Sequence, residues 1–141
     1  VHYPAVVPAN AVVDTPVFTA DLPPTILDLV GLPVPAGMDG QSLRPLLQGR
    51  PSALDARPIY AEMEGEPSPN SPGHWIAPAH DRRSVRDGAW KYVMAVGAPE
   101  EDALYQLRPK SVYEGDNMLA DYPQRAERLH QQIFDWFRMP T

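Results

Sequence analysis

Residues 82–96 read RRSVRDGAWKYVMAV and carry the strongest structural signal in the chain. The pair Asp87-Gly88 separates two runs rich in β-branched and aromatic side chains, a pattern that predicts a β-hairpin closed by a two-residue turn. A turn at these two residues predicts three cross-strand pairs: Val85 with Trp90, Arg83 with Tyr92, and Ser84 with Lys91. We expect the large apolar members of these pairs to face the core: Val85, Trp90 and Tyr92.

Three further segments extend the hairpin into a small α+β fold. Residues 58–63 (PIYAEM) alternate as a strand does, and residues 103–107 (ALYQL) form another short strand. From Tyr122 the spacing is that of an amphipathic helix whose apolar face comprises Ala126, Leu129, Ile133, Trp136 and Phe137. Because a two-stranded ribbon needs a cover, we expect a small antiparallel sheet of about four strands, packed on one face by this C-terminal helix and built from residues 58–63, 82–86, 89–95 and 103–107.

The first half of the chain is rich in proline, with 14 of the 18 prolines within residues 1–80. Regularly spaced apolar side chains in the same stretch favour ordered chain over disorder. We expect a broken or edge strand over residues 11–18, a helix that starts after Thr19 and ends at Gly31, and a second helix from Ser42 to Gln48. Each helix is expected to bury a narrow apolar stripe. Because the sequence opens at Val1 inside what reads as a structured region, we expect a C-terminal piece of a longer protein.

Composition excludes several classes of function. The chain has 141 residues, no cysteine, 18 acidic and 12 basic side chains, and a formal net charge of -6. Without cysteine it has no disulfide framework, thiolate zinc site or cysteine nucleophile. The acidic balance lacks the basic footprint of a nucleic-acid binder, and no apolar run reaches the roughly 18 residues of a membrane-spanning helix.

Known catalytic motifs are missing, and the unusual residues gather in one long loop. The sequence contains no GxGxxG, P-loop, GxSxG or HExxH pattern. Residues 64–80 (EGEPSPNSPGHWIAPAH) hold His74 and His80, which are readable as surface imidazoles or, less readily, as metal ligands. Trp75 in the same loop either anchors it to the core or lines a pocket. The aspartates have structural interpretations as helix-terminal or turn residues: Asp21, Asp28, Asp39, Asp81 and Asp87.

Several stretches resemble the sulfatase family, in the order in which that family carries them. Residues 21–35 (DLPPTILDLVGLPVP) and 38–49 (MDGQSLRPLLQG) are similar to its D-x-x-P-T and D-G-x-S-L-x-P-L-L-x-G motifs. Residues 83–93 (RSVRDGAWKYV) resemble its R-x-V-R-x-G-x-W-K-Y hairpin. Residues 104–107 (LYQL), followed by Glu114, Asn117, Leu119 and Ala120, resemble its L-Y-D-L…E-x-x-N-L-A passage. The resemblance covers nearly the whole chain.

The resemblance implies an alkaline-phosphatase-like α/β domain followed by a small C-terminal subdomain. It implies that residues 1–50 are the end of the catalytic domain and residues 51–141 the C-terminal α+β subdomain. The family's divalent metal, usually calcium, and its formylglycine nucleophile would then lie in a missing N-terminal catalytic domain, so we expect no catalytic or metal-binding residue in this chain. A sulfate ester of a small molecule or glycan would be the substrate of the whole protein.

The same resemblance implies a supporting role for this chain, which we expect to be inactive alone. His74, Trp75 and His80 are the candidate substrate contacts, on a loop that would reach the rim of the active-site pocket. Two alternatives stay open: part of a phosphonate or phosphate ester hydrolase of the same superfamily, or a stand-alone binding or structural module. We also expect the chain, taken alone, to expose apolar side chains from residues 1–50 and to form a homodimer that covers them.

Overall fold

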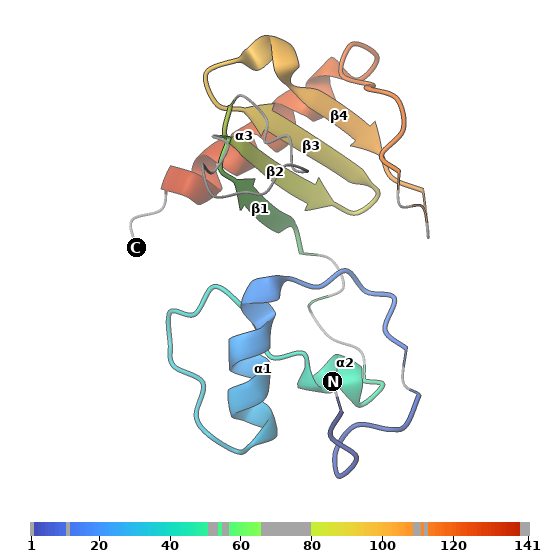
Figure 1. Ribbon diagram of the computed structural model, residues 1–141, viewed down its shortest axis with the longest axis vertical. Coiled ribbons are helices and arrows are strands. Elements are labelled where there is room, and N and C mark those ends of the chain that lie inside the picture. The colour runs from blue at the N-terminus through green and yellow to red at the C-terminus, as the bar shows by residue number, and fades with distance from the viewer. Residues whose placement is uncertain are drawn as a thin grey trace, which may run out of the picture. The chain divides into compact units, whose positions relative to one another are not determined.

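The computed structural model describes residues 2–10, 12–50, 54, 57–65, 80–108, 111 and 113–138. The chain divides into two compact units, Val1–Arg57 and Pro58–Thr141. Figure 1 shows the helices α1 and α2 in the first unit, and the sheet with helix α3 in the second. Each unit is described by itself.

The C-terminal unit is a four-stranded antiparallel sheet backed by one helix. Its strands are β1 (Ile59–Met63), β2 (Arg82–Asp87), β3 (Trp90–Ala95) and β4 (Ala103–Gln106), which lie side by side in the order β1-β2-β3-β4. A short 3₁₀ helix, η3 (Pro99–Glu101), links β3 to β4, and α3 (Pro123–Arg138) crosses one face of the sheet (Figure 1). The predicted fold of this unit is confirmed.

The register of the hairpin differs from the prediction by two residues. Asp87 pairs with Trp90, so the turn consists of Gly88 and Ala89, and Val85 pairs with Tyr92. The predicted turn residues Asp87 and Gly88 are therefore wrong: Gly88 adopts a positive φ of 60° at the first turn position, where a two-residue hairpin of the II′ kind requires glycine. The new pairing keeps every side chain on its predicted face, because moving the partner by two residues preserves the alternation.

The core of the C-terminal unit lies between the sheet and α3. Val85 and Leu104 from the sheet and Leu129 and Ile133 from α3 are fully buried there. Tyr60 stacks on Trp136 with ring centroids 4.2 Å apart, which ties β1 to the end of α3. The predicted apolar face of the last helix is therefore confirmed. The opposite face of the sheet carries the other alternating set, for which register gives Ile59, Ala61, Met63, Ser84, Arg86, Lys91 and Val93.

The N-terminal unit consists of short helices joined by irregular chain. A 3₁₀ turn, η1 (Thr19–Asp21), leads into α1 (Leu22–Leu29), and α2 spans Arg44–Leu47. Both prolines of α1 lie in its first turn, where no backbone donor is needed, as predicted. The second helix is shorter than the predicted 42–48, and the described residues 12–18 form no strand, so the strand predicted over 11–18 is wrong for them.

The apolar stripe of α1 is exposed. Leu22, Ile26 and Val30 are 48%, 60% and 59% exposed, whereas the buried residues of the helix are Pro24 and Thr25. The expectation that this helix buries its stripe within the chain is therefore wrong, and the expectation of exposed apolar side chains is confirmed.

Among the helices that the structure describes, none has the length and apolar character needed to cross a membrane.

Candidate functional site

The connection between β1 and β2 carries the predicted substrate contacts. Of these, His74 and Trp75 lie outside the described residues, and His80 is described at the end of the connection. The structure therefore locates the base of this loop, which consists of Gly65 on one side and His80 and Asp81 on the other.

Close backbone packing holds the two ends of the loop together. The backbone N–H of Gly65 donates to Oδ1 of Asp81 at 2.8 Å. A Cβ atom on Gly65 would lie 2.1 Å from the carbonyl carbon of His80, so only glycine allows this approach. The carbonyl oxygen of Asp81 accepts from the backbone N–H of Val96 at 2.9 Å. Asp81 thus has the structural role that its sequence position indicated, and His80 leaves the sheet from a defined point.

The His80 side chain lies beside a carboxylate that it shares with an arginine. Its Nε2 atom is 3.9 Å from Oε1 of Glu101, and the side chain is 39% exposed. Arg82 forms an ion pair with the same Glu101 carboxylate and also donates to its backbone carbonyl oxygen at 3.2 Å. An exposed imidazole beside a carboxylate is able to donate a hydrogen bond to an anionic ligand. Glu101 could not be predicted as a partner of His80, because no sequence motif links η3 to the loop base.

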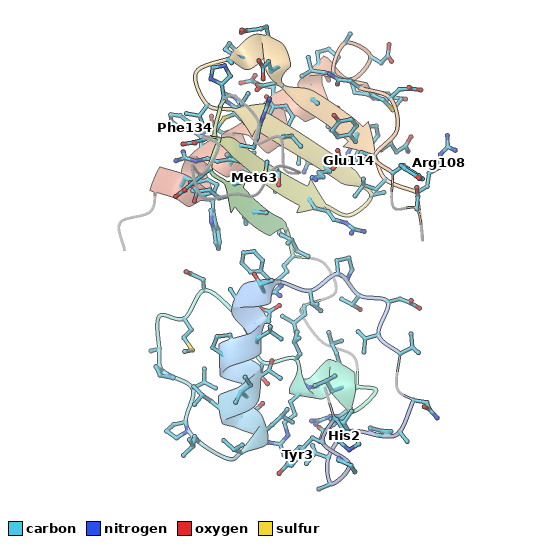
Figure 2. All side chains as sticks on the ribbon, viewed as in Figure 1. His2, Tyr3, Met63, Arg108, Glu114 and Phe134 are labelled. Atoms are coloured by element: carbon cyan, nitrogen blue, oxygen red, sulfur yellow. The ribbon has the colours of Figure 1, made fainter. Side chains whose placement is uncertain are left out.

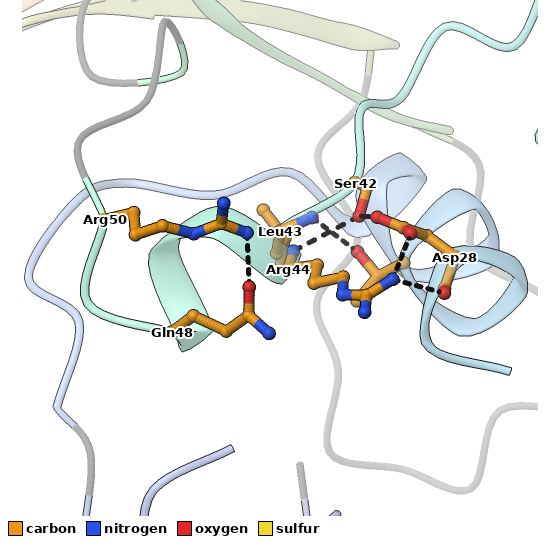
Figure 3. A network of polar contacts seen from close by, with 7 residues as sticks. Asp28, Ser42, Leu43, Arg44, Gln48 and Arg50 are labelled. Atoms are coloured by element: carbon orange, nitrogen blue, oxygen red, sulfur yellow. Dashed lines mark hydrogen bonds and ion pairs between the residues drawn. The ribbon is translucent and has the colours of Figure 1, made fainter. Parts of the chain in front are cut away.

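The residues of the two long motifs in the N-terminal unit form a polar network that is structural (Figure 3). The Ser42 hydroxyl donates to Oδ2 of Asp28 at 2.5 Å, and Arg44 donates to Oδ1 of Asp28 at 2.8 Å. These hydrogen bonds, first from Ser42 and then from Arg44, lower the pKa of the Asp28 carboxyl. The backbone N–H of Leu43 donates to the Thr25 hydroxyl at 2.8 Å. The network joins α1 to the start of α2.

Among the described residues of this unit, Asp21 is the charged residue buried most deeply. Its carboxylate is fully buried and accepts from the backbone N–H groups of Phe18 at 2.8 Å and Gln41 at 2.9 Å. It also forms an ion pair with Arg57. Burial alone would raise the pKa of Asp21, but the hydrogen bonds from Arg57, Gln41 and Phe18 outweigh it and lower the pKa. The structural interpretation of Asp21 is confirmed, although two of its partners, Gln41 and Arg57, are distant in sequence and were not predicted.

A neighbouring glycine allows this arrangement. Gly40 precedes the Gln41 donor, and a Cβ atom on it would lie 1.8 Å from the carbonyl oxygen of Ala20. The Asp-Gly pair at 39–40 is therefore a close backbone approach as well as a turn. Within the described part of the chain, no three His, Cys, Asp or Glu side chains come together as a metal site would require.

Comparison with known proteins identifies the chain. The family model described as N-sulphoglucosamine sulphohydrolase, C-terminal, matches residues 1–136. The chain belongs to this sulfatase family. Arylsulfatase D from Homo sapiens is 48% identical to this sulfatase region over 50 residues, which are 34% of this chain and 8% of that protein.

Solved structures agree with the sulfatase assignment. A phosphonate monoester hydrolase from Silicibacter pomeroyi matches with a TM-score of 0.61 and 27% identity, covering 86% of this chain and 25% of that one. A putative sulfatase from Bacteroides thetaiotaomicron matches with a TM-score of 0.62 and 25% identity, covering 83% of this chain and 23% of that one. This sulfatase region thus spans a quarter or less of the relatives it matches. It is the C-terminal portion of a sulfatase.

Proposed function

We propose that the protein containing this chain hydrolyses sulfuric esters and that this chain supports the reaction without catalysing it. The observation that carries the proposal is the family match over residues 1–136. Because the chain spans only a small part of its relatives, the activity belongs to the whole protein.

The catalytic groups would lie in the part of the protein that precedes this chain. Formylglycine would form there from the Cys or Ser of a C/S-x-P-x-R motif, and this sequence has neither a cysteine nor that motif. The family resemblance places calcium there as well, and among the described residues no three acidic or histidine side chains form a group that fits it. No step of the reaction is assigned to these 141 residues.

The exposed stripe of α1 supports a contact with that preceding part. Leu22, Ile26 and Val30 follow one another at helical spacing and present apolar surface to solvent. We assign residues 1–50 to the end of the catalytic domain, with this stripe packed on it, and residues 51–141 to the C-terminal subdomain. A homodimer would cover the same stripe in the chain taken alone.

The loop between β1 and β2 would bring His74, Trp75 and His80 to the rim of the substrate pocket. The support for this role is the loop base, where Gly65, Asp81 and Val96 define the point from which His80 departs. An imidazole placed in this way would donate to a sulfate oxygen or to a neighbouring group of the substrate.

We expect His80→Ala in the full-length protein to lower kcat/KM on a sulfate ester by about 10-fold or more, as loss of a hydrogen bond to a charged group predicts. Steady-state kinetics measures the effect, and the exposed His2→Ala serves as the matched control. Equal kinetics for the two variants would remove His80 from the substrate contacts. A thermal unfolding curve for each variant separates this loss from misfolding.

A second function is supported by two of the structural matches. Phosphonate monoester hydrolases from Silicibacter pomeroyi and Agrobacterium radiobacter match with 27% and 26% identity. Paired aryl sulfate and aryl phosphonate substrates, assayed with the full-length protein, distinguish the two functions. Sulfatase function predicts the higher kcat/KM on the sulfate, and the reverse order would establish the alternative.

A further inference from the structure

A pocket lies on the face of the sheet that α3 leaves uncovered. It has a volume of about 310 Å³ and is bounded by β1, β2 and β3 and by the chain after β4, up to Glu114, which Figure 2 labels. Its floor includes the apolar side chains of Ile59 and Ala61. The loop base with His80 does not line it.

Two cations face each other in this pocket. Arg86 and Lys91 are direct partners across β2 and β3, an arrangement that is unfavourable unless an anion lies nearby. Glu114 forms an ion pair with Lys91. Nε of Arg86 donates to the carbonyl oxygen of Gly88 at 3.2 Å, and among the described residues no carboxylate forms an ion pair with Arg86. Within the described part of the chain, one positive charge of the pair is therefore available to a ligand.

A neutral polar residue lines the same pocket as the arginine. Ser84 lies two residues before Arg86 on the same strand and the same face, and it is one of the residues that line the pocket. The guanidinium group presents two parallel donors that match the oxygens of a sulfate or carboxylate, so the wall is suited to a planar or tetrahedral oxyanion.

An exposed aromatic ring borders the same pocket. Tyr113 is 82% exposed, yet its backbone is held by Ser111, whose hydroxyl donates to the Tyr113 carbonyl oxygen at 3.0 Å and accepts from its N–H at 3.1 Å. An exposed tyrosine ring provides a flat apolar surface with a polar end. Such a surface beside an oxyanion site suits a ligand that carries its charge on a ring.

We propose that this pocket binds the sulfate or carboxylate group of an acidic saccharide. Arg86 would bind the oxyanion through its fork, Ser84 would donate to it, Lys91 would add positive charge, and Tyr113 would contact the sugar ring. The saccharide rests on the proposed function, because a sulfated sugar is one of the sulfate esters that the whole protein would meet. The oxyanion site itself rests only on the residues of the pocket.

Hydrogen exchange of the full-length protein, read by mass spectrometry, tests the site locally. The probes are a sulfated uronic-acid disaccharide, the same disaccharide without sulfate, and neutral lactose. We expect the sulfated probe to slow exchange in residues 107–115 and lactose to leave it unchanged. Equal protection by the sulfate-free probe would identify the carboxylate as the bound group. No protection of this segment by either charged probe would overturn the proposal.

Variants assign the effect to the arginine. We expect Arg86→Gln, and also Arg86→Lys, which keeps the charge but loses the fork, to raise the probe concentration for half protection by about 10-fold or more. Arg108→Gln removes the same charge nearby, and Figure 2 shows Arg108 pointing away from the sheet. Equal loss in Arg108→Gln and Arg86→Gln would show diffuse attraction and overturn the proposal.

The readout separates the two proposals. Protection of residues 107–115 in a protein that does not cleave sulfate esters would keep the site and reject the proposed function. Cleavage without protection would keep the function and reject the site. In the absence of ligand, the Arg86 variants should show the same exchange rates in β2 and β3 as the unsubstituted protein, which would show that they are folded.

Discussion

Replacing Asp21 with alanine is expected to lower the free energy of unfolding of the N-terminal unit by about 3–5 kcal/mol, the usual cost of removing one partner of a buried ion pair. The substitution leaves the Arg57 guanidinium, which is mostly buried, without its counter-charge. It also leaves the N–H groups of Phe18 and Gln41 without their acceptor. Asp21→Asn, which keeps an acceptor oxygen but not the charge, should cost less.

Hydrogen exchange of the α1 amides measures this effect, because it reports the local free energy of opening. Asp14→Ala is the matched control, since Asp14 is an exposed carboxylate of the same unit. A loss as small as that of the control would contradict the role given to Asp21.

The same measurement has an expected pH dependence. The pKa of Asp21 is lowered in the folded state, so the carboxylate stabilises the fold at all pH values above its unfolded pKa of about 3.9. That stability is lost as the pH falls from there through the lower, folded pKa. Asp28 contributes in the same direction. Asp21→Ala should therefore reduce the acid sensitivity of α1 exchange, and an unchanged pH profile would show that Asp21 is not its source.

Replacing Leu129 with alanine is expected to destabilise the C-terminal unit by about 2–5 kcal/mol, the range for truncating a buried leucine. Leu129 is fully buried and lies in the cluster with Val85, Tyr92 and Leu104. The smaller side chain leaves a cavity between the sheet and α3. The neighbouring side chains cannot move far enough to fill it, because the strand ladder and α3 hold their backbones in place.

Urea unfolding followed by tryptophan fluorescence measures this effect. All three tryptophans, at positions 75, 90 and 136, belong to the C-terminal unit, so the signal reports that unit alone. Glu127→Ala, at an exposed position two residues earlier on α3, is the control and should change the midpoint little. Similar midpoints for the two variants would mean that Leu129 does not hold the helix to the sheet.

The elements of the C-terminal unit could be predicted because their signals are local. Alternation along 58–63, 82–87 and 90–95, and helical spacing from Tyr122, depend only on neighbours within a few residues. Local signals did not determine the register of the hairpin. Asp87-Gly88 and Gly88-Ala89 are both plausible turns, and packing of the sheet on α3 tolerates either because both keep Val85 and Tyr92 inside.

The candidate site could be predicted only in part. The loop after β1 stood out by its histidines, its tryptophan and its prolines, but the partner of His80 did not. The partner, Glu101, lies in η3, and two strands of the sheet separate it from His80 along the chain. In the same way, Ser42 has the sequence position of a helix cap, and its hydroxyl does accept from the backbone N–H of Arg44 at 3.2 Å, but its donation to Asp28 could not be predicted.

By itself, the sequence determined the strand and helix content of the C-terminal unit, the faces of its hairpin and its membership of the sulfatase family. Those properties follow from residue order, through short-range periodicity and through motifs read along the chain. The tertiary structure alone decided the hairpin register, the buried partners of Asp21, the base of the β1–β2 loop and the pairing of Arg86 with Lys91. Each of these joins residues that are separate in sequence, so it exists only after the backbone has brought their polar groups within hydrogen-bonding distance.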